Sequence, residues 1–307
     1  MQTEFTGVLE RTKTTRLDKN EVAAQEKQNG VDVLDLTPSQ LRAFRWNELS
    51  IVFQSAMNAL NPVMDIGTQI MDVLAAHQSG RSEQARKQRA GELLRLVGIS
   101  PDRLRSYPHE LSGGMRQRVV IAIALALNPE VIIMDEPTTA LDVVVQREIL
   151  DLISSLCKET GTALIFITHD LSLLLELVDR VAVMYAGKLV EVASRSDFYD
   201  HPRHPYSYGL MNSFPTLHGP RHKMSGIPGS PPDLRNIPAG CPFHERCPFA
   251  FDACREQVPR LRVAVAGEDE QVAACHLYNP RHRPTIPAAS DLARGYAAQL
   301  EEGRSVR

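Results

Sequence analysis

Two adjacent acidic residues follow a short apolar segment in the middle of the chain. Residues 131–134 are all apolar and follow turn-forming residues, which predicts a buried strand that ends at Asp135 and Glu136. In open α/β sheets, ligands bind at the carboxyl edge of the strands. In phosphoryl-transfer sites one such carboxylate holds Mg²⁺, and a second can polarise the attacking water. By itself, the pattern also fits a strand followed by a capped helix without any chemistry.

A glycine-containing turn upstream of the acidic pair has the composition of an anion-binding loop. Ser112, Gly113 and Gly114 precede a segment that we predict to be helical as far as residue 127. Glycines let backbone N–H groups approach a phosphate, and the N-terminus of a helix favours negative charge. A Ser-Gly-Gly turn alone is often only the start of a helix. Together with the acidic pair, it predicts a site for phosphate and Mg²⁺.

Four of the five cysteines form a local cluster in the last third of the sequence: Cys241, Cys247, Cys254 and Cys275. Their spacing is looser than the paired C-x-x-C of zinc ribbons, but four thiolates can close one metal site. If the metal is zinc, His244 or His276 could replace a cysteine. The alternative is four reduced cysteines that only pack in a proline-rich segment. Cys157 is expected to be an ordinary core residue.

The predicted elements explain how these side chains could be positioned. Periodicity and turn residues predict strands at residues 31–36, 49–53 and 163–168, helices at 66–76, 84–97, 144–160 and 171–178, and a hairpin over 181–192. Thr37 and Pro38 are typical of a helix start, and Ala186 and Gly187 of a hairpin turn. The alternation of strands and helices predicts an α/β fold with a parallel sheet.

Composition and charge exclude several classes of protein. The chain has 307 residues, of which 43% are hydrophobic and 23% charged, as is usual for globular proteins. A formal net charge of −3 provides no general attraction to nucleic acid. No apolar run approaches the roughly 20 residues that cross a bilayer, and the N-terminus has no signal-peptide core. We therefore expect a cytoplasmic chain that only a partner could hold at a membrane.

The two ends of the chain differ in composition from its middle. Residues 1–29 are polar and patternless, which indicates a frayed or foreign N-terminus. More than half of the 20 prolines lie in residues 201–260, which disfavours long helices and central strands there. We expect an irregular C-terminal extension over residues 201–285 and a tail over 286–307. The sequence does not decide whether residues 290–302 form an amphipathic helix.

Considered together, these motifs resemble those of the nucleotide-binding subunits of ABC transporters. Five segments carry the resemblance: residues 111–117 as the signature motif, 131–136 as the Walker B strand, 137–142 as the D-loop, His169 as the switch histidine and Gln54 as the Q-loop glutamine. The resemblance implies a P-loop NTPase-like ABC domain over residues 30–200, with a helical subdomain over residues 62–118. It also implies ATP as the nucleotide and Mg²⁺ as its metal.

The resemblance assigns a role to each matching residue. Asp135 would help to hold Mg²⁺, Glu136 would act as general base, and His169 would reach the γ-phosphate. Gln54 would sense the metal and the attacking water, and would begin the segment that touches the membrane subunits. The remaining nucleotide-binding positions would be Ser112, Gly113, Gly114, Gln117 and Asp142.

Within that family, the chain is similar to the branch that imports dipeptides and oligopeptides. The matching segments are residues 53–62, 201–206, 227–232 and 241–248. This branch also contains nickel importers and some sugar importers. Its likeness implies a [4Fe-4S] cluster on the four clustered cysteines, with zinc as the rival. It further implies a second ABC ATPase subunit, two transmembrane permease subunits, an extracytoplasmic solute-binding protein acting indirectly, and a place at the cytoplasmic face of the membrane.

The sequence departs from the family pattern in one respect. A P-loop, G-x-x-x-x-G-K-[ST], is expected before Gln54, but the only glycines ahead of it are Gly7 and Gly30. One explanation is a truncated or mis-started ATPase, which we favour. The other is a non-catalytic partner subunit whose signature motif completes the ATP site of a second subunit. A DNA-repair or chromosome-organising ATPase would require a central coiled coil, and no sustained heptad pattern is present.

Overall fold

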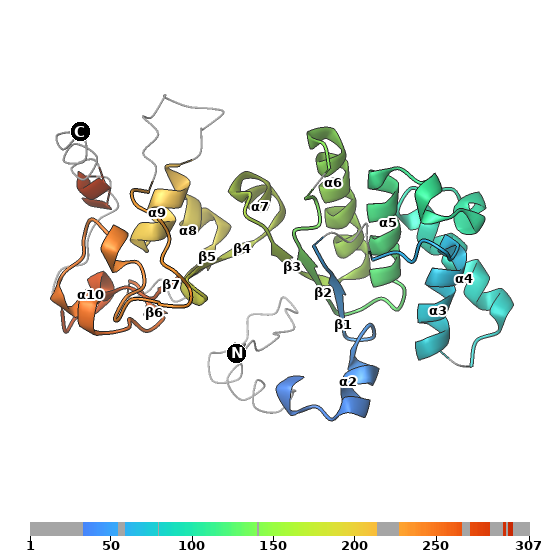
Figure 1. The fold of residues 1–307 in the computed structure, drawn as a ribbon, viewed down its shortest axis with the longest axis horizontal. Helices are drawn as coiled ribbons and strands as arrows, with labels where there is room; N and C mark the ends of the chain where they lie inside the picture. Colours follow the sequence, from blue (N-terminus) through green and yellow to red (C-terminus); the bar gives the residue numbers. More distant parts are fainter. Residues whose placement is uncertain are drawn as a thin grey trace. The chain divides into compact units, whose positions relative to one another are not determined.

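The computed structural model describes residues 33–54, 59–78, 80–139, 141–213, 227–265, 271–282, 291–292 and 294–296. It divides into two compact units, Met1–His169 and Asp170–Arg307, each of which is considered by itself (Figure 1). The predicted N-terminal segment at residues 1–29 lies outside the described residues, and so does most of the predicted tail. The domain limits predicted near residues 30, 200 and 285 stay predictions.

A three-stranded parallel sheet forms the centre of the first unit. Its strands are β1 (Leu49–Val52), β2 (Val131–Asp135) and β3 (Ala163–Ile167), in the order β1-β2-β3. The predicted parallel sheet is therefore confirmed. The prediction of a strand at residues 31–36 is wrong, because Val33–Asp35 forms a short 3-10 helix, η1. This apolar run pairs with no described strand, and the Thr37-Pro38 helix start follows it closely.

The two faces of this sheet differ in burial. Ile132 and Met134 of β2 point to a buried face, on which α5 (Gly113–Ala124) packs against β1 and α6 (Val143–Thr160). The alternate residues point the other way, and Ile51, Ile165 and Ile167 are 41%, 41% and 46% exposed. Parallel sheets are usually covered on both faces. In contrast, the second face of this sheet exposes these apolar side chains.

Helices of the first unit form a second small core, as the predicted helical subdomain requires. It contains α3 (Ile66–His77), α4 (Glu83–Leu96) and the 3-10 helices η3 (Pro101–Arg105) and η4 (Pro108–Glu110). Asp65 and Ser82 cap the N-termini of α3 and α4. Ile70, Leu74 and Leu93 are fully buried between the packed helices. The helices predicted at residues 66–76 and 84–97 are confirmed to within one residue at each end.

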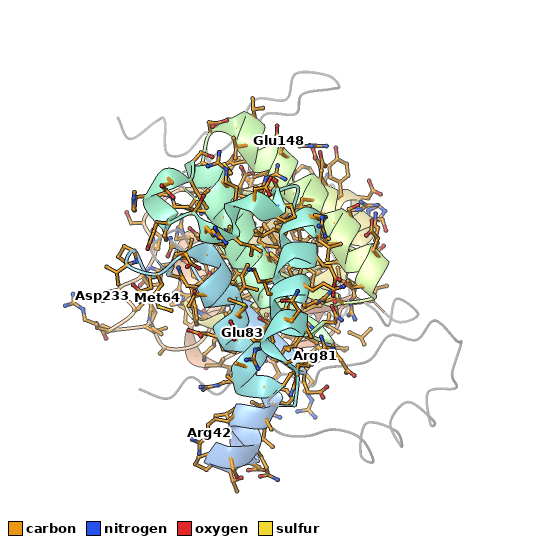
Figure 2. The ribbon with its side chains drawn as sticks, turned by 90° about the vertical axis from the view of Figure 1, so that its right-hand side faces the viewer. Arg42, Met64, Arg81, Glu83, Glu148 and Asp233 are labelled. Carbon is orange, nitrogen blue, oxygen red and sulfur yellow. The ribbon has the colours of Figure 1, made fainter. Side chains whose placement is uncertain are left out.

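Helix α2 (Pro38–Phe44) has a different character from the other helices of this unit. Thr37 and Gln40 form a capping box at its N-terminus, so the predicted helix start is confirmed. No residue of α2 is buried. Figure 2 shows Arg42 on this helix, with Arg81 and Glu83 above it at the turn between α3 and α4. Local capping rather than burial therefore defines α2.

The second unit is built on a four-stranded antiparallel sheet. Its strands are β4 (Arg180–Tyr185), β5 (Lys188–Ser194), β6 (Arg262–Val263) and β7 (Val272–Ala273), in the order β4-β5-β7-β6. Ala186 and Gly187 join β4 to β5 with φ of 49° and 76°, the left-handed pair of a tight hairpin turn. The predicted hairpin is confirmed. The helices are α7 (Leu171–Leu177), α8 (Arg195–Asp200), α9 (Pro205–Met211) and α10 (Asp252–Glu256), with short 3-10 helices η5 (His244–Arg246) and η6 (His276–Tyr278).

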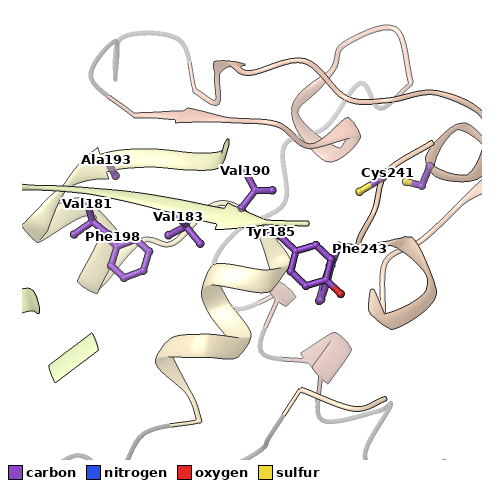
Figure 3. Close-up of a cluster of buried hydrophobic side chains, with 9 residues drawn as sticks. Val181, Val183, Tyr185, Val190, Ala193, Phe198, Cys241 and Phe243 are labelled. Carbon is purple, nitrogen blue, oxygen red and sulfur yellow. The ribbon is translucent and has the colours of Figure 1, made fainter. Parts of the chain in front are cut away.

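One hydrophobic core joins the hairpin to the cysteine-containing segment. Figure 3 shows Val183, Tyr185 and Val190 of the hairpin in the same cluster as Cys241 and Phe243. The Tyr185 and Phe243 rings meet edge to face, with centroids 5.2 Å apart. The hairpin is thus the platform on which the cysteine-containing segment packs.

A buried carboxylate connects the motif at residues 201–206 to this platform. Glu191 of β5 accepts hydrogen bonds from the backbone nitrogens of Arg203 and His204, both at 2.8 Å, and from Nε2 of Gln271 at 3.0 Å. Burial raises the pKa of Glu191 and lowers the pKa of His204 to about 3. The satisfied carboxylate therefore fixes the path of the chain before α9.

Part of the C-terminal tail is ordered against the second unit. Residues 291–292 and 294–296 are helical, and Leu292 and Tyr296 are buried. The Tyr296 hydroxyl donates a hydrogen bond of 2.6 Å to the carbonyl of Pro205. Of the two alternatives left open for residues 290–302, these described residues favour the helix. Among the described residues, no helix is long and apolar enough to cross a membrane.

Candidate functional site

The backbone of Glu136 holds the central carboxylate of the candidate site. Glu136 directly follows β2 and has a φ of 45°, which is uncommon for a residue with a side chain. Its backbone nitrogen donates a hydrogen bond of 2.8 Å to the carbonyl of Ile167, the last residue of β3. The left-handed turn thus places Glu136 at the carboxyl edge of the sheet, where ligands bind in open α/β folds.

Three side chains converge on the Glu136 carboxylate, two of them from other segments of the chain. Its Oε2 accepts from Nε2 of Gln54 at 2.9 Å and from Oγ1 of Thr139 at 3.0 Å. Its Oε1 lies 2.8 Å from Nδ1 of His169. The structure therefore brings together all three residues predicted to be catalytic, from the ends of β1, β2 and β3. Thr139 was not predicted; its place three residues after the acid, in a turn, is the signal that could have identified it.

The environment keeps Glu136 ionised. The hydrogen bond with His169 is the largest cause of a lowered pKa at Glu136, and the hydrogen bond from Thr139 is the next. Because a carboxylate only accepts, Nδ1 of His169 carries the proton in this contact. The His169 side chain is 78% exposed, so the rest of its ring can contact a ligand. An ionised acid with an oriented imidazole beside it can bind and activate a water.

Asp135 lies one residue before Glu136 and is the candidate for holding the metal. It is the last residue of β2, in register with Ile167 of β3. Among the described residues, the side chain of Asp135 has no hydrogen-bond or ion-pair partner, so both of its carboxylate oxygens can bind a cation. Gln54 donates to Glu136 through Nε2, which leaves its Oε1 as an acceptor. Carboxylate and amide oxygens are ligands that Mg²⁺ prefers, and these residues therefore fit Mg²⁺.

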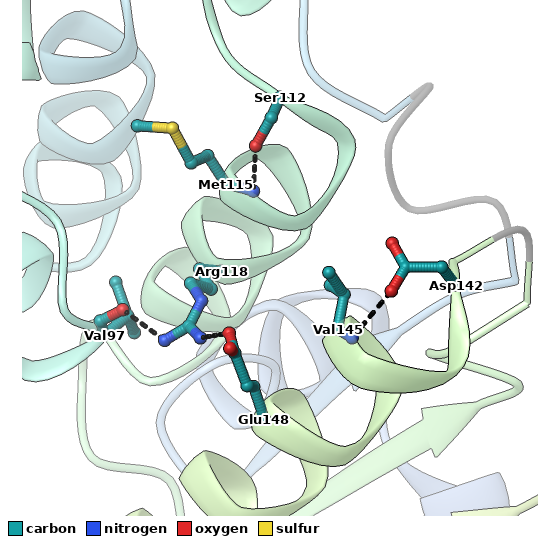
Figure 4. A network of polar contacts seen from close by, with 7 residues as sticks. All are labelled: Val97, Ser112, Met115, Arg118, Asp142, Val145 and Glu148. Carbon is teal, nitrogen blue, oxygen red and sulfur yellow. Dashed lines mark hydrogen bonds and ion pairs between the residues drawn. The ribbon is translucent and has the colours of Figure 1, made fainter.

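The predicted signature residues lie at the start of α5. Ser112 is the N-cap of α5, and its Oγ accepts from the backbone nitrogen of Met115 at 3.3 Å (Figure 4). Gly113 and Gly114 form the first turn. A Cβ on Gly114 would lie 2.7 Å from Cγ1 of Val145, so glycine is needed for the approach of α5 to α6. The helix start thus exposes backbone N–H groups.

Two other predicted binding residues, Asp142 and Gln117, lie at the start of α6 and on α5. Asp142 caps α6, and its Oδ1 accepts from the backbone nitrogen of Val145 at 3.0 Å. Gln117 is buried on α5, and its Nε2 has no hydrogen-bond partner among the described residues. No contact among the described residues joins the predicted signature group to Glu136. The nucleotide-binding roles predicted for these residues stay predictions.

Arg118 connects the signature helix to its neighbours and was not identified from the sequence. Its guanidinium donates to the carbonyl of Val97 at 3.2 Å and to Oε2 of Glu148 on α6 at 2.9 Å. Figure 4 shows Arg118 between these two partners. Arg118 is one of two arginines on α5, and no sequence pattern distinguishes the one that makes this contact. It fixes α5 relative to both the preceding turn and α6.

The four clustered cysteines lie in the core of the second unit. Burial is the main cause of a pKa of about 11 for Cys241 and about 12 for Cys247, and it raises the pKa of Cys275 well above its ordinary value. Nearby thiols contribute to each of these shifts, and Cys254 is among them. The backbone nitrogen of Cys241 donates 2.8 Å to the carbonyl of Cys254. The four cysteines therefore face a shared region of the core.

No metal centre is defined by this region. Among the described residues, no group of three or more His, Cys, Asp or Glu residues could hold a metal ion as arranged. Nδ1 of His244 and Nε2 of His276 each lie 2.8 Å from a backbone carbonyl, of Cys241 and Gln257 respectively. Cys157 is only partly buried on α6, and burial raises its pKa to about 11.

Comparison with known families matches both parts of the chain. Residues 13–139 match the family described as "ABC transporter". Residues 190–254 match the family described as "Oligopeptide/dipeptide transporter, C-terminal region". The first match includes Gln54 and Glu136 at the sheet edge, and the second includes most of β5 and three of the clustered cysteines.

Individual relatives extend these matches over most of the chain. The oligopeptide transport ATP-binding protein AppD of Bacillus subtilis is 46% identical over 249 residues, which are 80% of this chain and 75% of AppD. The dipeptide transport ATP-binding protein DppD of Caldanaerobacter subterraneus is 43% identical over 81% of this chain and 76% of its own length. A solved ATP-binding cassette, bound to ADP and Pi after hydrolysis, covers 52% of this chain and 68% of its own, with 29% identity and a TM-score of 0.47.

The two family matches and the transport ATP-binding relatives define the class of protein to which the chain belongs: an ABC-type ATPase domain that precedes a peptide-transporter C-terminal region. It is a member of the family of oligopeptide and dipeptide transport ATP-binding proteins of ABC transporters. The family predicted from the sequence motifs is confirmed. Whether a P-loop is part of the natural protein stays a prediction.

Proposed function

We propose that this chain binds and hydrolyses ATP to power the import of peptides through an ABC transporter. The observation that carries the proposal is the convergence of Gln54, Thr139 and His169 on Glu136 at the carboxyl edge of a parallel sheet. The relatives named for oligopeptide and dipeptide transport support peptides as the cargo.

The residues at the sheet edge suit each step of hydrolysis. Ionised Glu136 orients a water and accepts its proton, while His169 holds the carboxylate in place and presents its ring to the γ-phosphate. Asp135 and Oε1 of Gln54 would hold Mg²⁺. The metal would neutralise phosphate charge as the γ-phosphoryl group leaves. The first turn of α5 would offer its N–H groups to nucleotide held by a second ATPase subunit.

Other parts of the assembly follow from the same proposal. The chain would work at the cytoplasmic face of the membrane with a second ABC ATPase subunit and two permease subunits. A solute-binding protein outside the membrane would deliver the cargo. Support comes from the peptide-transporter C-terminal match and from relatives named as transport proteins.

Reconstitution tests this function. The permease subunits and second ATPase are placed in vesicles with or without this chain, and ATP-dependent uptake of a labelled dipeptide and a labelled pentapeptide is measured. We expect uptake only when the chain is present. Uptake of nickel or a sugar in place of either peptide would contradict the proposed cargo, and equal uptake without the chain would contradict its proposed role.

We also propose that the four clustered cysteines hold a [4Fe-4S] cluster. The four thiols pack in the core of one unit and could supply the four ligands of a cluster, but the described residues are not arranged as a metal-binding group, so binding would have to draw them together. When bound, the cluster would cross-link the C-terminal extension. Anaerobically purified protein is expected to contain iron and acid-labile sulfide, both lost in Cys247→Ser but retained in Cys157→Ser. Zinc without iron would identify the rival site, and absence of both metals would contradict a metal role.

A further inference from the structure

A cationic cavity in the second unit has no role in the function proposed above. Its volume is about 530 Å³, within the range of small-ligand sites. None of the described lining residues is an aspartate or glutamate, and five of them are arginine or histidine: Arg260, Arg262, Arg281, His276 and His282. These side chains come from β6, which contains Arg262, and from the segments before β6 and after β7. The fold, rather than local sequence, therefore gathers the positive charge.

The three guanidinium groups of this cavity have no acidic partner among the side chains that the structure describes. Among the described residues, Arg260, Arg262 and Arg281 make no side-chain hydrogen bond or ion pair. Arg246, in the same unit, instead donates to Tyr185 and to three backbone carbonyls. Like charges brought to one recess repel each other, so an entering anion relieves that repulsion as well as accepting hydrogen bonds.

Contacts within the protein hold the polar side chains of the cavity, His276, His282 and Asn279, in place. His276 is 5% exposed, and its Nε2 lies 2.8 Å from the carbonyl of Gln257. Because a carbonyl only accepts, this nitrogen carries a proton and the ring orientation is fixed. The His282 ring packs edge to face on His276, with centroids 5.0 Å apart. Asn279 accepts from the backbone nitrogen of Arg281 through Oδ1, so its Nδ2 remains as a donor.

We propose that this cavity binds a phosphate-bearing anion. Planar guanidinium groups donate in pairs to phosphate oxygens, and three of them can contact several oxygens of one ligand at the same time. The chemistry is shared by two sources, a soluble phosphorylated compound and the phosphorylated headgroup of a membrane lipid. The competing occupant is the chain itself, because Glu268, Asp269 and Glu270 lie between β6 and β7, outside the described residues.

Binding of inorganic pyrophosphate to the full chain tests the proposal by titration calorimetry. The cavity variant is Arg260→Gln with Arg281→Gln, both exposed positions whose replacement leaves the core intact. The matched control is Arg180→Gln with Arg255→Gln, two exposed arginines of the same unit outside the cavity lining. We expect the cavity variant to bind at least about tenfold more weakly and the control to stay within about twofold of the parent.

A flotation assay separates the two sources of phosphate. The parent and both variants are mixed with vesicles of phosphatidylcholine alone or with added phosphatidylglycerol. Flotation that requires the anionic lipid, and that only the cavity variant loses, assigns a lipid headgroup. Pyrophosphate binding without flotation assigns a soluble phosphate compound.

Three results would overturn the proposal. The parent could fail to bind both pyrophosphate and anionic vesicles, or the two variants could lose binding equally. Binding could also occur only in the variant Glu268→Gln, Asp269→Asn, Glu270→Gln, which would show that the chain's own acidic segment occupies the cavity.

Discussion

At the residue scale, the position of the Glu136 carboxylate depends on hydrogen bonds, two of which come from residues far away in the sequence. Three segments must meet before its carboxylate is held at 2.8 to 3.0 Å by His169, Gln54 and Thr139. The resemblance to ABC subunits predicted Gln54 and His169, each of which follows an apolar strand. Thr139 escaped prediction because a threonine in a turn is common, and only its hydrogen bond distinguishes it.

Removal of the Thr139 hydroxyl should change the pH dependence of ATP hydrolysis. The hydrogen bond from Thr139 helps to lower the pKa of Glu136, so this carboxylate stays ionised above its depressed pKa and gains a proton as the pH falls through it. In Thr139→Val we expect the acidic limb of the ATPase pH profile to move to higher pH. Thr160→Val, on α6 away from the site, provides the control. An unchanged acidic limb in Thr139→Val would contradict this role.

At the scale of elements, the contact between α5 and α6 depends on a glycine and two caps. Gly114 leaves no room for a Cβ beside Val145, and Ser112 and Asp142 begin the two helices. Arg118 then bridges α5 to Glu148 on α6. The predicted binding motif is therefore also the packing surface that positions the helix start.

A substitution pair tests this close approach. Gly114→Ala should lower the free energy of unfolding by about 1–3 kcal/mol, because the stiff Val145 side chain must move. Urea unfolding should show that the added cost of Gly114→Ala is smaller in a Val145→Ala background, a coupling that a double-mutant cycle isolates. Additive effects of the two substitutions would mean that the two side chains do not compete for the same space.

The elements also show where sequence patterns succeed and fail. Helices α3 and α4 were predictable to within one residue because Asp65 and Ser82 cap amphipathic segments. The strand prediction for residues 31–36 was wrong because strand propensity alone does not supply a pairing partner, and Val33–Asp35 forms a 3-10 helix instead. The cavity lined by Arg260 and Arg281 could not be predicted from a sequence pattern, since tertiary packing brings its lining residues together.

At the scale of the whole molecule, the exposed face of the parallel sheet is the feature that its local patterns did not reveal. Apart from Asp135 at the end of β2, the alternate residues of the three strands are apolar, and Phe53 beside them is 63% exposed. The sequence predicted a buried strand at residues 131–134, since an uninterrupted apolar run indicates burial on both faces. The described residues bury only one side, under α5 and α6.

This apolar face should bind a hydrophobic dye. Ile165→Thr with Ile167→Thr is expected to reduce 1-anilinonaphthalene-8-sulfonate fluorescence of the folded chain, because two adjacent exposed side chains of the face become polar. The control is Val143→Thr with Val144→Thr, which removes two exposed apolar side chains from the start of α6. Equal fluorescence losses in the two variants would show that the sheet face is not a contiguous apolar surface.

The central claim is that Glu136 activates the water that attacks ATP. Single-turnover hydrolysis of radiolabelled ATP by the reconstituted transporter, with a P-loop segment restored ahead of Gln54 and nucleotide binding measured in parallel, tests it most directly. In Glu136→Gln we expect retained binding and a fall of at least about a hundredfold in the rate of the chemical step, as is typical for loss of a general base. The control Glu159→Gln, an exposed glutamate on α6, should hydrolyse at the parent rate. Hydrolysis at the parent rate in Glu136→Gln would contradict the account.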